Sequence, residues 1–421
     1  MRPVIITNVA LAIIWLCFFR YCQKHSFHDP STLFYDPARA YTQEYSAVRE
    51  AEAQEFLTKA ATIPATAAKP LLYDNKTDTS GNSEKPEGIK LCVGVPSVRR
   101  DRENFVGKTL ASLADTLSVE ERKRLNLKVL LGEFVSSSHP VYGQDWLPNI
   151  ADEVLVYGED GSNPIEAYHL IANSSLRWLP EDSRNKRVQL DYANLIGKCR
   201  NEGADYFVLV EDDVIASRDW FKRLTRSIEE VEARSNGHDW LYLRLFYTET
   251  YLGWNSEEWK VYLGNSLLLF TVVTGTFLFV RWRSPAMKPL KATDMIKANL
   301  DLIYLIAFWM AMYIGLYFMA GRLLVSPYRV GVHEMPQYGC CAQGLAMPYR
   351  NLDKLERGLR EPGYEMAGDS FIDMVAERNG LKKWVMVPSV LQHIGIRGSS
   401  DQGYLKTTWN FSFEKGPWPL R

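Results

Sequence analysis

Glu211, Asp212 and Asp213 form a run of three acidic residues that could do chemistry together. They come directly after Tyr206–Val210, an apolar and β-branched segment that predicts a buried strand. Because a buried strand cannot carry three carboxylates in its middle, we expect the acids where the strand leaves its sheet, which is where open α/β sheets bind ligands. Clustered carboxylates there suit a hard divalent cation, Mn²⁺ or Mg²⁺, that also contacts the phosphates of a nucleotide. The alternative is that the acids only cap the helix that follows at Ser217.

A histidine and an arginine are predicted to reach the same edge of the sheet. His393 follows the last predicted strand, and a neutral imidazole beside carboxylates completes the shell of a Mn²⁺ ion. The predicted metal ligands are therefore Glu211, Asp213 and His393. Arg397, four residues further on, can neutralise a diphosphate. The alternative for His393 is a hydrogen-bonded structural histidine.

Pro96, Arg99 and Arg100 follow the first predicted strand, where a bound nucleotide would lie. Their alternative is a solvated basic turn. We predict that the nucleotide and its metal are held by these three residues together with Arg397 and the three acids, Glu211, Asp212 and Asp213.

Asp369 begins a predicted helix and could deprotonate an acceptor hydroxyl, which a direct-displacement transfer needs. The predicted catalytic residues are Asp369 and Asp213. Asp369 could equally be a helix N-cap. Three other acids compete for the role of base: Glu334, Glu365 and Asp373.

The elements that must position these residues alternate between strands and helices. The pattern predicts strands at 90–95, 127–131, 153–157, 206–210, 240–246 and 383–387, and helices at 106–117, 195–202, 217–232, 352–359 and 369–377. This alternation indicates an α/β fold with a mostly parallel, doubly wound sheet.

Three uncharged runs of membrane length interrupt this pattern: Val4–Phe19, Val261–Val280 and Leu302–Gly321. The first lacks a signal-peptidase motif, so we expect a retained anchor. The second carries several threonines, which leaves a buried core helix as its alternative. The second and third runs flank a short basic loop and predict a transmembrane hairpin.

The loop Arg281–Lys297 has five basic residues and one acid, which places it in the cytosol by the positive-inside bias. The N-terminus is then cytosolic, and the soluble segments share the lumenal side. The glycosylation sequons at Asn75, Asn173 and Asn410 all fall in those lumenal segments.

The cysteines also suit a lumenal compartment, which permits disulfides. One of Cys340 and Cys341 could bridge to Cys92 or Cys199, but the sequence does not determine the pairing.

The predicted organisation has five parts. They are a cytosolic tip and anchor (1–25), a lumenal stem (26–88), the first part of the α/β domain (89–260), the hairpin (261–321, with its loop at 281–299) and the second part of the α/β domain (322–421). The stem includes a possible helix at 47–61.

These features together resemble the GT-A glycosyltransferases, which place an acidic triplet after a central strand. Val210–Val214 looks like that motif, with Glu-Asp-Asp in place of the commoner Asp-x-Asp. A GT-A domain split by tandem membrane helices resembles the post-GPI-attachment N-acetylgalactosamine transferase family of the Golgi. Val95–Arg100, Gln189–Tyr192 and Gln392–Gly395 also resemble motifs of the N-acetylglucosaminyltransferase IV family. The resemblance covers most of the chain from Ile89.

The resemblance implies that Glu211, Asp212 and Asp213 hold Mn²⁺ and the diphosphate of a UDP-sugar. It also implies a GPI glycan on GPI-anchored proteins as the acceptor, N-acetylgalactosamine as the sugar, a Golgi location and an inverting transfer with Asp369 as base. Three alternatives are a transferase for another UDP-hexose on a GPI or N-glycan acceptor, a non-catalytic GPI-glycan-binding protein, and a small transporter, whose membrane helices would need ionisable residues that these runs lack.

A nucleic-acid partner is not expected. The chain has a net charge of -1, and no basic stripe is interleaved with aromatic residues.

Overall fold

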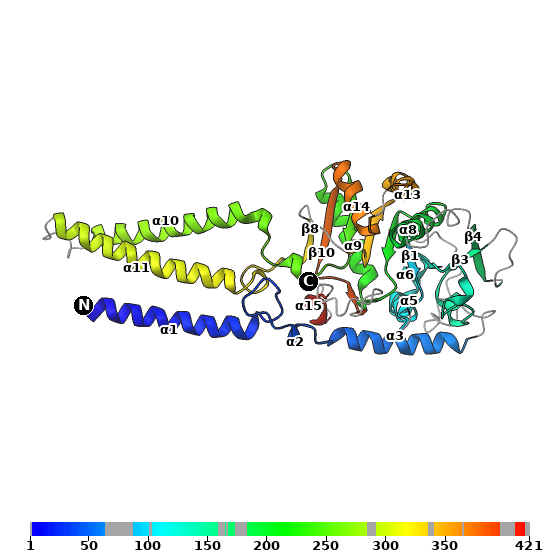
Figure 1. Cartoon of the computed structure of the whole chain (residues 1–421), viewed down its shortest axis with the longest axis horizontal. Coiled ribbons are helices and arrows are strands. Elements are labelled where there is room, and N and C mark those ends of the chain that lie inside the picture. The colour runs from blue at the N-terminus through cyan, green and yellow to red at the C-terminus, as the bar shows by residue number, and fades with distance from the viewer. Residues whose placement is uncertain are drawn as a thin grey trace. The chain divides into compact units, whose positions relative to one another are not determined.

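The computed structural model describes residues 2–63, 87–100, 103–158, 165, 167–172, 183–283, 292–335, 341–363, 366–395 and 409–416. The chain forms two compact units, each built from two separate stretches of sequence. Unit 1 comprises Met1–Thr42 and Glu249–Tyr328, and unit 2 comprises Gln43–Thr248 and Arg329–Arg421. Their secondary structure is shown in Figure 1.

In the described residues, unit 2 contains a nine-stranded sheet in the order β4-β3-β2-β1-β5-β9-β7-β10-β8. Its strands are β1 (Leu91–Ser97), β2 (Leu125–Leu131), β3 (Glu153–Gly158), β4 (Tyr168–Ala172), β5 (Tyr206–Val210), β7 (Trp240–Arg244), β8 (Gly331–Glu334), β9 (Gly344–Pro348) and β10 (Lys382–Val387). A second, two-stranded sheet pairs β6 (Val214–Ala216) with β11 (Leu391–His393).

The large sheet is rich in parallel pairs, as the sequence predicts. β1 pairs in parallel with β2 and β5, β3 pairs in parallel with β2 and β4, and β7 pairs in parallel with β10. The antiparallel strands β8 and β9 come from the second stretch of the unit, and β9 lies between β5 and β7. The two stretches of unit 2 therefore share one sheet.

Helices cover both faces of this sheet. On one face, α3 (Tyr45–Ala61), α5 (Val106–Ala114), α7 (Trp146–Ile150) and α9 (Trp220–Arg234) share a core with every second residue of β1, such as Val93. On the other face, α8 (Arg184–Arg200), α13 (Leu352–Arg360) and α14 (Gly368–Arg378) pack with the alternate residues, such as Cys92. Short helices α6 (Val119–Lys123) and α15 (Phe411–Glu414) complete the described part of the unit.

Helix α3 lies in the region that the sequence assigns to a stem, but the structure packs it into unit 2. Arg49 is fully buried, its Nη2 lies 2.7 Å from Asp115 Oδ1, and its Nε donates to the carbonyl of Ala216 at 2.9 Å. The fully buried Ala53 and Ala60 and the partly buried Phe56 and Leu57 also make the contact. The sequence predicts a helix at 47–61 but not its place in the core, because alanines and an arginine among its inward residues give a weak amphipathic signal.

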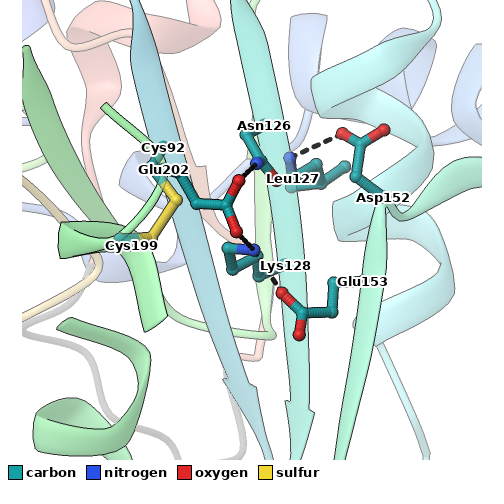
Figure 2. Close-up of a disulfide and its surroundings, with 8 residues drawn as sticks. All are labelled: Cys92, Asn126, Leu127, Lys128, Asp152, Glu153, Cys199 and Glu202. Carbon is teal, nitrogen blue, oxygen red and sulfur yellow. Dashed lines mark hydrogen bonds and ion pairs between the residues drawn. A yellow bond between two sulfur atoms is a disulfide. The ribbon is translucent and has the colours of Figure 1, made fainter. Parts of the chain in front are cut away.

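A disulfide joins Cys92 of β1 to Cys199 of α8, with the Cα atoms 5.7 Å apart (Figure 2). The expected bridge from either of these residues to Cys340 or Cys341 is therefore excluded, and Cys341 is itself disulfide-bonded. Around the bridge, Lys128 contacts both Glu153 and Glu202, which ties β2 to β3 and to the end of α8 (Figure 2).

Unit 1 contains α1 (Arg2–His25), α2 (Pro37–Ala40), α10 (Trp259–Arg283), α11 (Ala292–Met319) and α12 (Arg322–Val325). Within the described residues, three helical segments are long and apolar enough to cross a membrane: Val4–His25, Glu249–Arg283 and Asn299–Met319. They coincide with the three predicted runs and indicate a membrane protein. The predicted loop between the two hairpin helices is 281–299. In the structure α10 ends at Arg283 and α11 begins at Ala292, so the segment between the helices is shorter than predicted.

Candidate active site

The three acids lie at the carboxyl edge of the large sheet. β5 ends at Val210, the acids follow, and the chain then enters β6. Because β5 runs parallel to β1, the carboxyl ends of both strands meet here. The side chains of Asp212 and Asp213 are buried, and Glu211 is partly exposed. The acids do not form a helix cap, because α9 starts only at Trp220.

Arg100 lies between two of these acids. Its Nη2 is 2.5 Å from Asp212 Oδ1 and 2.9 Å from Asp213 Oδ2. Burial lowers the pKa of Arg100, but the charges of Asp213 and Asp212 outweigh burial and raise it. Arg100 is therefore a fixed cation that partly balances two buried carboxylates. Its Nε and Nη1 have no hydrogen-bond partner among the described residues.

The structure brings His393 to the same acids. β11 pairs with β6 so that His393 is opposite Val214, and His393 Nε2 lies 3.1 Å from Asp213 Oδ2. Burial raises the pKa of Asp213, but His393 and Arg100 together lower it to about 2. Gly395 packs directly against this carboxylate, and a Cβ atom at position 395 would lie 2.5 Å from Asp213 Oδ2.

A second pair of polar residues, which the sequence did not single out, holds Asp212. The backbone N–H of Val141 approaches His139 Nδ1 at 3.4 Å, so we assign the ring proton to Nε2, which lies 3.1 Å from Ser97 Oγ. Ser97 Oγ then donates to Asp212 Oδ2 at 2.7 Å. Burial lowers the pKa of His139 to about 4, so the imidazole is neutral at pH 7. Ser97 ends β1, two residues beyond the predicted strand, and nothing in the sequence links it to His139.

Asp369 lies close enough to Glu211 for its charge to raise the pKa of Glu211. The pKa of Glu211 is raised well above its ordinary value by burial and by the charges of Asp213, Asp369 and Asp212. Asp369 is in the first turn of α14, and its Oδ2 accepts a hydrogen bond from the backbone N–H of Cys341 at 3.0 Å. It is not the N-cap of this helix, because that residue is Ala367.

The competing acids are placed differently. Asp373 accepts a hydrogen bond from Tyr242 Oη and lies 3.7 Å from Arg244, so it belongs to a buried network on α14. Glu334 is exposed on β8, at the far edge of the sheet, where it pairs with Lys382. Glu365 lies outside the described residues.

The remaining predicted nucleotide-binding residues are only partly placed. Pro96 is within β1, partly exposed, close to the carboxyl end of the strand. Arg99 is exposed, and its backbone N–H donates to Glu133 Oε1 at 2.7 Å. Arg397 lies outside the described residues.

The glycosylation prediction for Asn410 is not supported. Its side chain is fully buried, Nδ2 donates to the carbonyl of Tyr247 at 2.8 Å, and Oδ1 caps α15. A glycan cannot be attached to a side-chain nitrogen in such a position in the folded unit. The sequons at Asn75 and Asn173 lie outside the described residues.

Asp191 is another buried acid near the carboxyl edge. It lies on α8, Tyr157 Oη donates to its Oδ1 at 2.6 Å, and a Cβ at Gly132 would be 3.0 Å from its Oδ2. Burial raises the pKa of Asp191 to about 7. Asp191 belongs to the Gln189–Tyr192 segment. Its sequence signal is a single acidic residue on the buried face of a helix, which could have identified it as a candidate functional residue.

The acids fit a hard cation in donor type and in charge. Asp213 Oδ1 and His393 Nδ1 are buried and have no hydrogen-bond partner among the described residues. Burial and the charges of the neighbouring acids raise the pKa of Glu211, and a bound cation would offset that repulsion. In the described part of the chain, however, no three His, Cys, Asp or Glu side chains already converge as a complete metal-binding group.

A parallel-rich α/β unit with acids at its carboxyl edge, where such sheets bind ligands, in a chain with three membrane-length helices, is consistent with a membrane-bound glycosyltransferase. The comparisons with known proteins agree. The family model for GPI-N-acetylgalactosamine transferase PGAP4 matches residues 166–392, more than half of the chain. The chain belongs to this family.

Relatives in a second group of transferases match a shorter region. Alpha-1,3-mannosyl-glycoprotein 4-beta-N-acetylglucosaminyltransferase C of Sus scrofa is 31% identical over 146 residues, which cover 34% of this chain and 30% of the relative. The corresponding enzyme A of Xenopus tropicalis is 27% identical over 167 residues, 37% of this chain and 29% of the relative. The chain therefore spans less than a third of the length of these relatives.

Proposed function

We propose that the protein is a Golgi membrane glycosyltransferase that moves N-acetylgalactosamine from a UDP-sugar to the mannose core of GPI anchors. The observation that carries this proposal is the set of buried acids at the carboxyl edge, with Arg100 and His393 bound to them, in a chain of the PGAP4 family. Carboxylates and a fixed guanidinium at a sheet edge suit a nucleotide diphosphate and its cation.

In this proposal, unit 2 is a lumenal GT-A domain. The helices α10 and α11 form a membrane hairpin inserted between its two stretches, α1 is a second anchor, and the N-terminus is cytosolic. The sequence supports this orientation through the basic residues between the two hairpin spans. Such a chain holds its catalytic unit beside a lipid-linked acceptor, which reduces the entropic cost of their encounter.

Glu211, Asp213 and His393 would hold a Mn²⁺ or Mg²⁺ ion, which would stabilise the negative charge on the departing UDP. Arg100 fixes Asp212 and Asp213, and its unpaired Nε and Nη1 can donate to phosphate oxygens. His139 and Ser97 hold Asp212 in place from the other side.

Asp369 is the proposed base. The acceptor oxygen forms a bond to the anomeric carbon while the bond from that carbon to the UDP oxygen breaks, and the acceptor proton passes to Asp369. The backbone N–H of Cys341 orients this carboxylate. Attack on the face opposite UDP inverts the configuration of the sugar.

A UDP-release assay on detergent-solubilised full-length protein tests the function. Mn²⁺, a GPI-glycan acceptor and UDP-GalNAc, UDP-GlcNAc, UDP-Gal or UDP-Glc would be supplied in turn. We expect acceptor-dependent release with UDP-GalNAc, reduced by about 100-fold or more in Asp213→Asn and in Asp369→Asn.

Asp353→Asn is the matched control, because Asp353 is an exposed residue of α13 and should leave the rate unchanged. If no donor releases UDP and the protein does not bind UDP in the presence of Mn²⁺, the transferase proposal fails. A non-catalytic glycan-binding protein would then be the better description.

A second candidate is transfer of N-acetylglucosamine to an N-glycan. Its support is the identity to 4-beta-N-acetylglucosaminyltransferases, which covers about a third of the chain. The same assay separates the two, because release with UDP-GlcNAc and a mannosyl glycoprotein acceptor, and not with UDP-GalNAc, would favour the second candidate.

A further inference from the structure

Unit 1 contains a cavity of about 550 Å³ that the proposed transfer reaction does not use. Its walls come from the C-terminal end of α1, with Arg20, Gln23 and Lys24, from residues 33–36, and from Arg39 on α2. The three α1 residues are spaced i, i+3 and i+4, so they share one face of the helix. A volume of this size is ample for a small charged group.

The chain after α1 folds back to form the opposite wall of the cavity. Phe34 packs edge-on against Phe19, with the ring centroids 5.0 Å apart, and the backbone N–H of Leu33 donates to the carbonyl of Met319 at 3.1 Å. The buried carboxylate of Asp29 accepts from the backbone N–H groups of Ser31 and Leu323. The cavity is therefore built by tertiary contacts with the end of α11, and it is not a gap beside a frayed helix.

The cavity carries excess positive charge. It is lined by three cations, Arg20, Lys24 and Arg39, and one acid, Asp36. Asp36 is already used as the N-cap of α2, where it accepts from the backbone N–H of Ala38. None of the three cations forms an ion pair within the described residues. Arg20 donates to Gln23 at 3.0 Å, and Arg39 stacks over the ring of Phe27.

The cavity also lies where the sequence of α1 changes from apolar to ionised. Val4–Phe19 is uncharged, and Arg20 is the first ionised residue after it. Ionised residues that flank a membrane span lie at the level of the lipid headgroups. Cations there can form charge-assisted hydrogen bonds with lipid phosphates, but a simple flanking charge needs no cavity and no second wall.

We propose that this cavity binds the phosphodiester headgroup of a membrane lipid, with Arg20, Lys24 and Arg39 as its phosphate-binding residues. The headgroup belongs either to a phospholipid of the bilayer or to the inositol phospholipid of the acceptor. The second source rests on the proposed function. In both cases the bound lipid fixes the end of α1 at the membrane surface.

Lipid binding by the full-length protein in phosphatidylcholine nanodiscs tests the proposal, with phosphatidylinositol as the added probe and native mass spectrometry as the readout. The triple variant Arg20→Gln/Lys24→Gln/Arg39→Gln should bind phosphatidylinositol about tenfold more weakly, since three charge-assisted contacts are lost. Lys260→Gln is the matched control, because Lys260 is a cation at the start of α10 outside the cavity. It should bind the probe like the unmodified protein.

Equal binding by the triple variant and the unmodified protein would overturn the proposal, and so would an equal loss in Lys260→Gln. The variants should keep the thermal unfolding midpoint of the unmodified protein, because the three replaced side chains make no ion pair within the described residues. Inorganic phosphate that displaces phosphatidylinositol at equal concentration would overturn the assignment to a lipid.

A purified GPI glycolipid serves as a second probe. If it binds at least about tenfold more tightly than phosphatidylinositol, the acceptor is the source of the headgroup, and equal binding identifies bilayer phospholipid. Asp213→Asn should bind both probes normally. In the unmodified protein, no UDP release together with normal lipid binding counts against the proposed function alone, and normal UDP release together with no lipid binding counts against this inference alone.

Discussion

The charge balance of the acidic site depends on single residues. The sequence predicts Arg100 as a nucleotide-binding residue, and the structure places its guanidinium on Asp212 and Asp213. A guanidinium that bridges two buried carboxylates orients them before any ligand binds. In the proposed function, its Nε and Nη1, which have no hydrogen-bond partner among the described residues, would donate to a phosphate.

Removal of Arg100 should therefore lower the free energy of unfolding, independently of any effect on catalysis. Arg100→Met leaves Asp212 and Asp213 buried without their counter-ion, and we expect the free energy of unfolding to fall by about 3 kcal/mol at neutral pH. Denaturant unfolding measures this loss, with Arg99→Met as the matched control because Arg99 is exposed. A loss of equal size in both variants would show that Arg100 is not the counter-ion that holds the acids.

The free energy of unfolding depends on pH through the protonation of His139. The pKa of this buried imidazole is about 4 in the folded protein and 6.5 ordinarily, so between these values the unfolded chain binds more protons. Its contribution to stability is complete above pH 6.5 and is lost as the pH falls towards 4, to a total of about 3 kcal/mol.

Thermal unfolding between pH 7.5 and 4.5 should show part of this loss in the unmodified protein and not in His139→Gln. The control is His169→Gln, because His169 is largely exposed on β4 and should leave the pH dependence unchanged. A pH dependence that is the same in His139→Gln and in the unmodified protein would exclude a buried neutral role for this histidine.

At the scale of elements, the disulfide joins the sheet to a helix that covers it. Cys92 and Cys199 are separated by 107 residues, and a closed loop of this length restricts the unfolded chain strongly. We expect Cys92→Ala/Cys199→Ala to lose about 4 kcal/mol of stability, measured by denaturant unfolding under non-reducing conditions.

Cys17→Ala is the control, because Cys17 is an exposed free thiol of α1. A double variant as stable as this control would mean that the contacts of Lys128 with Glu153 and Glu202, and not the bridge, hold this end of the unit together.

The elements that the sequence predicts are those with a strong local pattern. The apolar runs of β1, β5 and β10 and the helices α5, α9 and α13 were all predictable, because burial on both faces or on one stripe leaves a clear signal. β9 was not, since its place between β5 and β7 depends on pairing with residues about 100 or more positions earlier. Helix α3 was predicted as a helix and not as part of a core, because alanines and one buried arginine stand among the residues that make its contact.

The same distinction holds in the site. Glu211, Asp212, Asp213 and His393 stand next to predicted strands, so the rule for carboxyl edges brings them together. Nothing local links His139 to Ser97, or Asp191 to Tyr157, because these contacts join the strands β1 and β3 to a loop and to α8, which are distant in sequence.

At the scale of the whole molecule, unit 2 needs both of its stretches. β9 fills the position between β5 and β7, so Gln43–Thr248 alone would leave two apolar strands with open edges. All the strands of the large sheet belong to unit 2, and none lies within Glu249–Tyr328 in the described part of the chain. The intervening segment is therefore dispensable for the fold of this sheet.

A chain in which a Gly/Ser linker of about 20 residues replaces Glu249–Tyr328, and which starts at Gln43, should fold as a soluble domain. It should keep the Cys92–Cys199 bridge and bind UDP in the presence of Mn²⁺, because every placed residue of the acidic site lies in unit 2. We expect transfer to a short soluble glycan to survive and transfer to a membrane-embedded GPI acceptor to fall by about 100-fold, since the gain from co-localisation at the membrane is lost. If the linked domain transfers to both acceptors equally well, the membrane helices do not present the acceptor, and their contribution is limited to keeping the enzyme in its compartment.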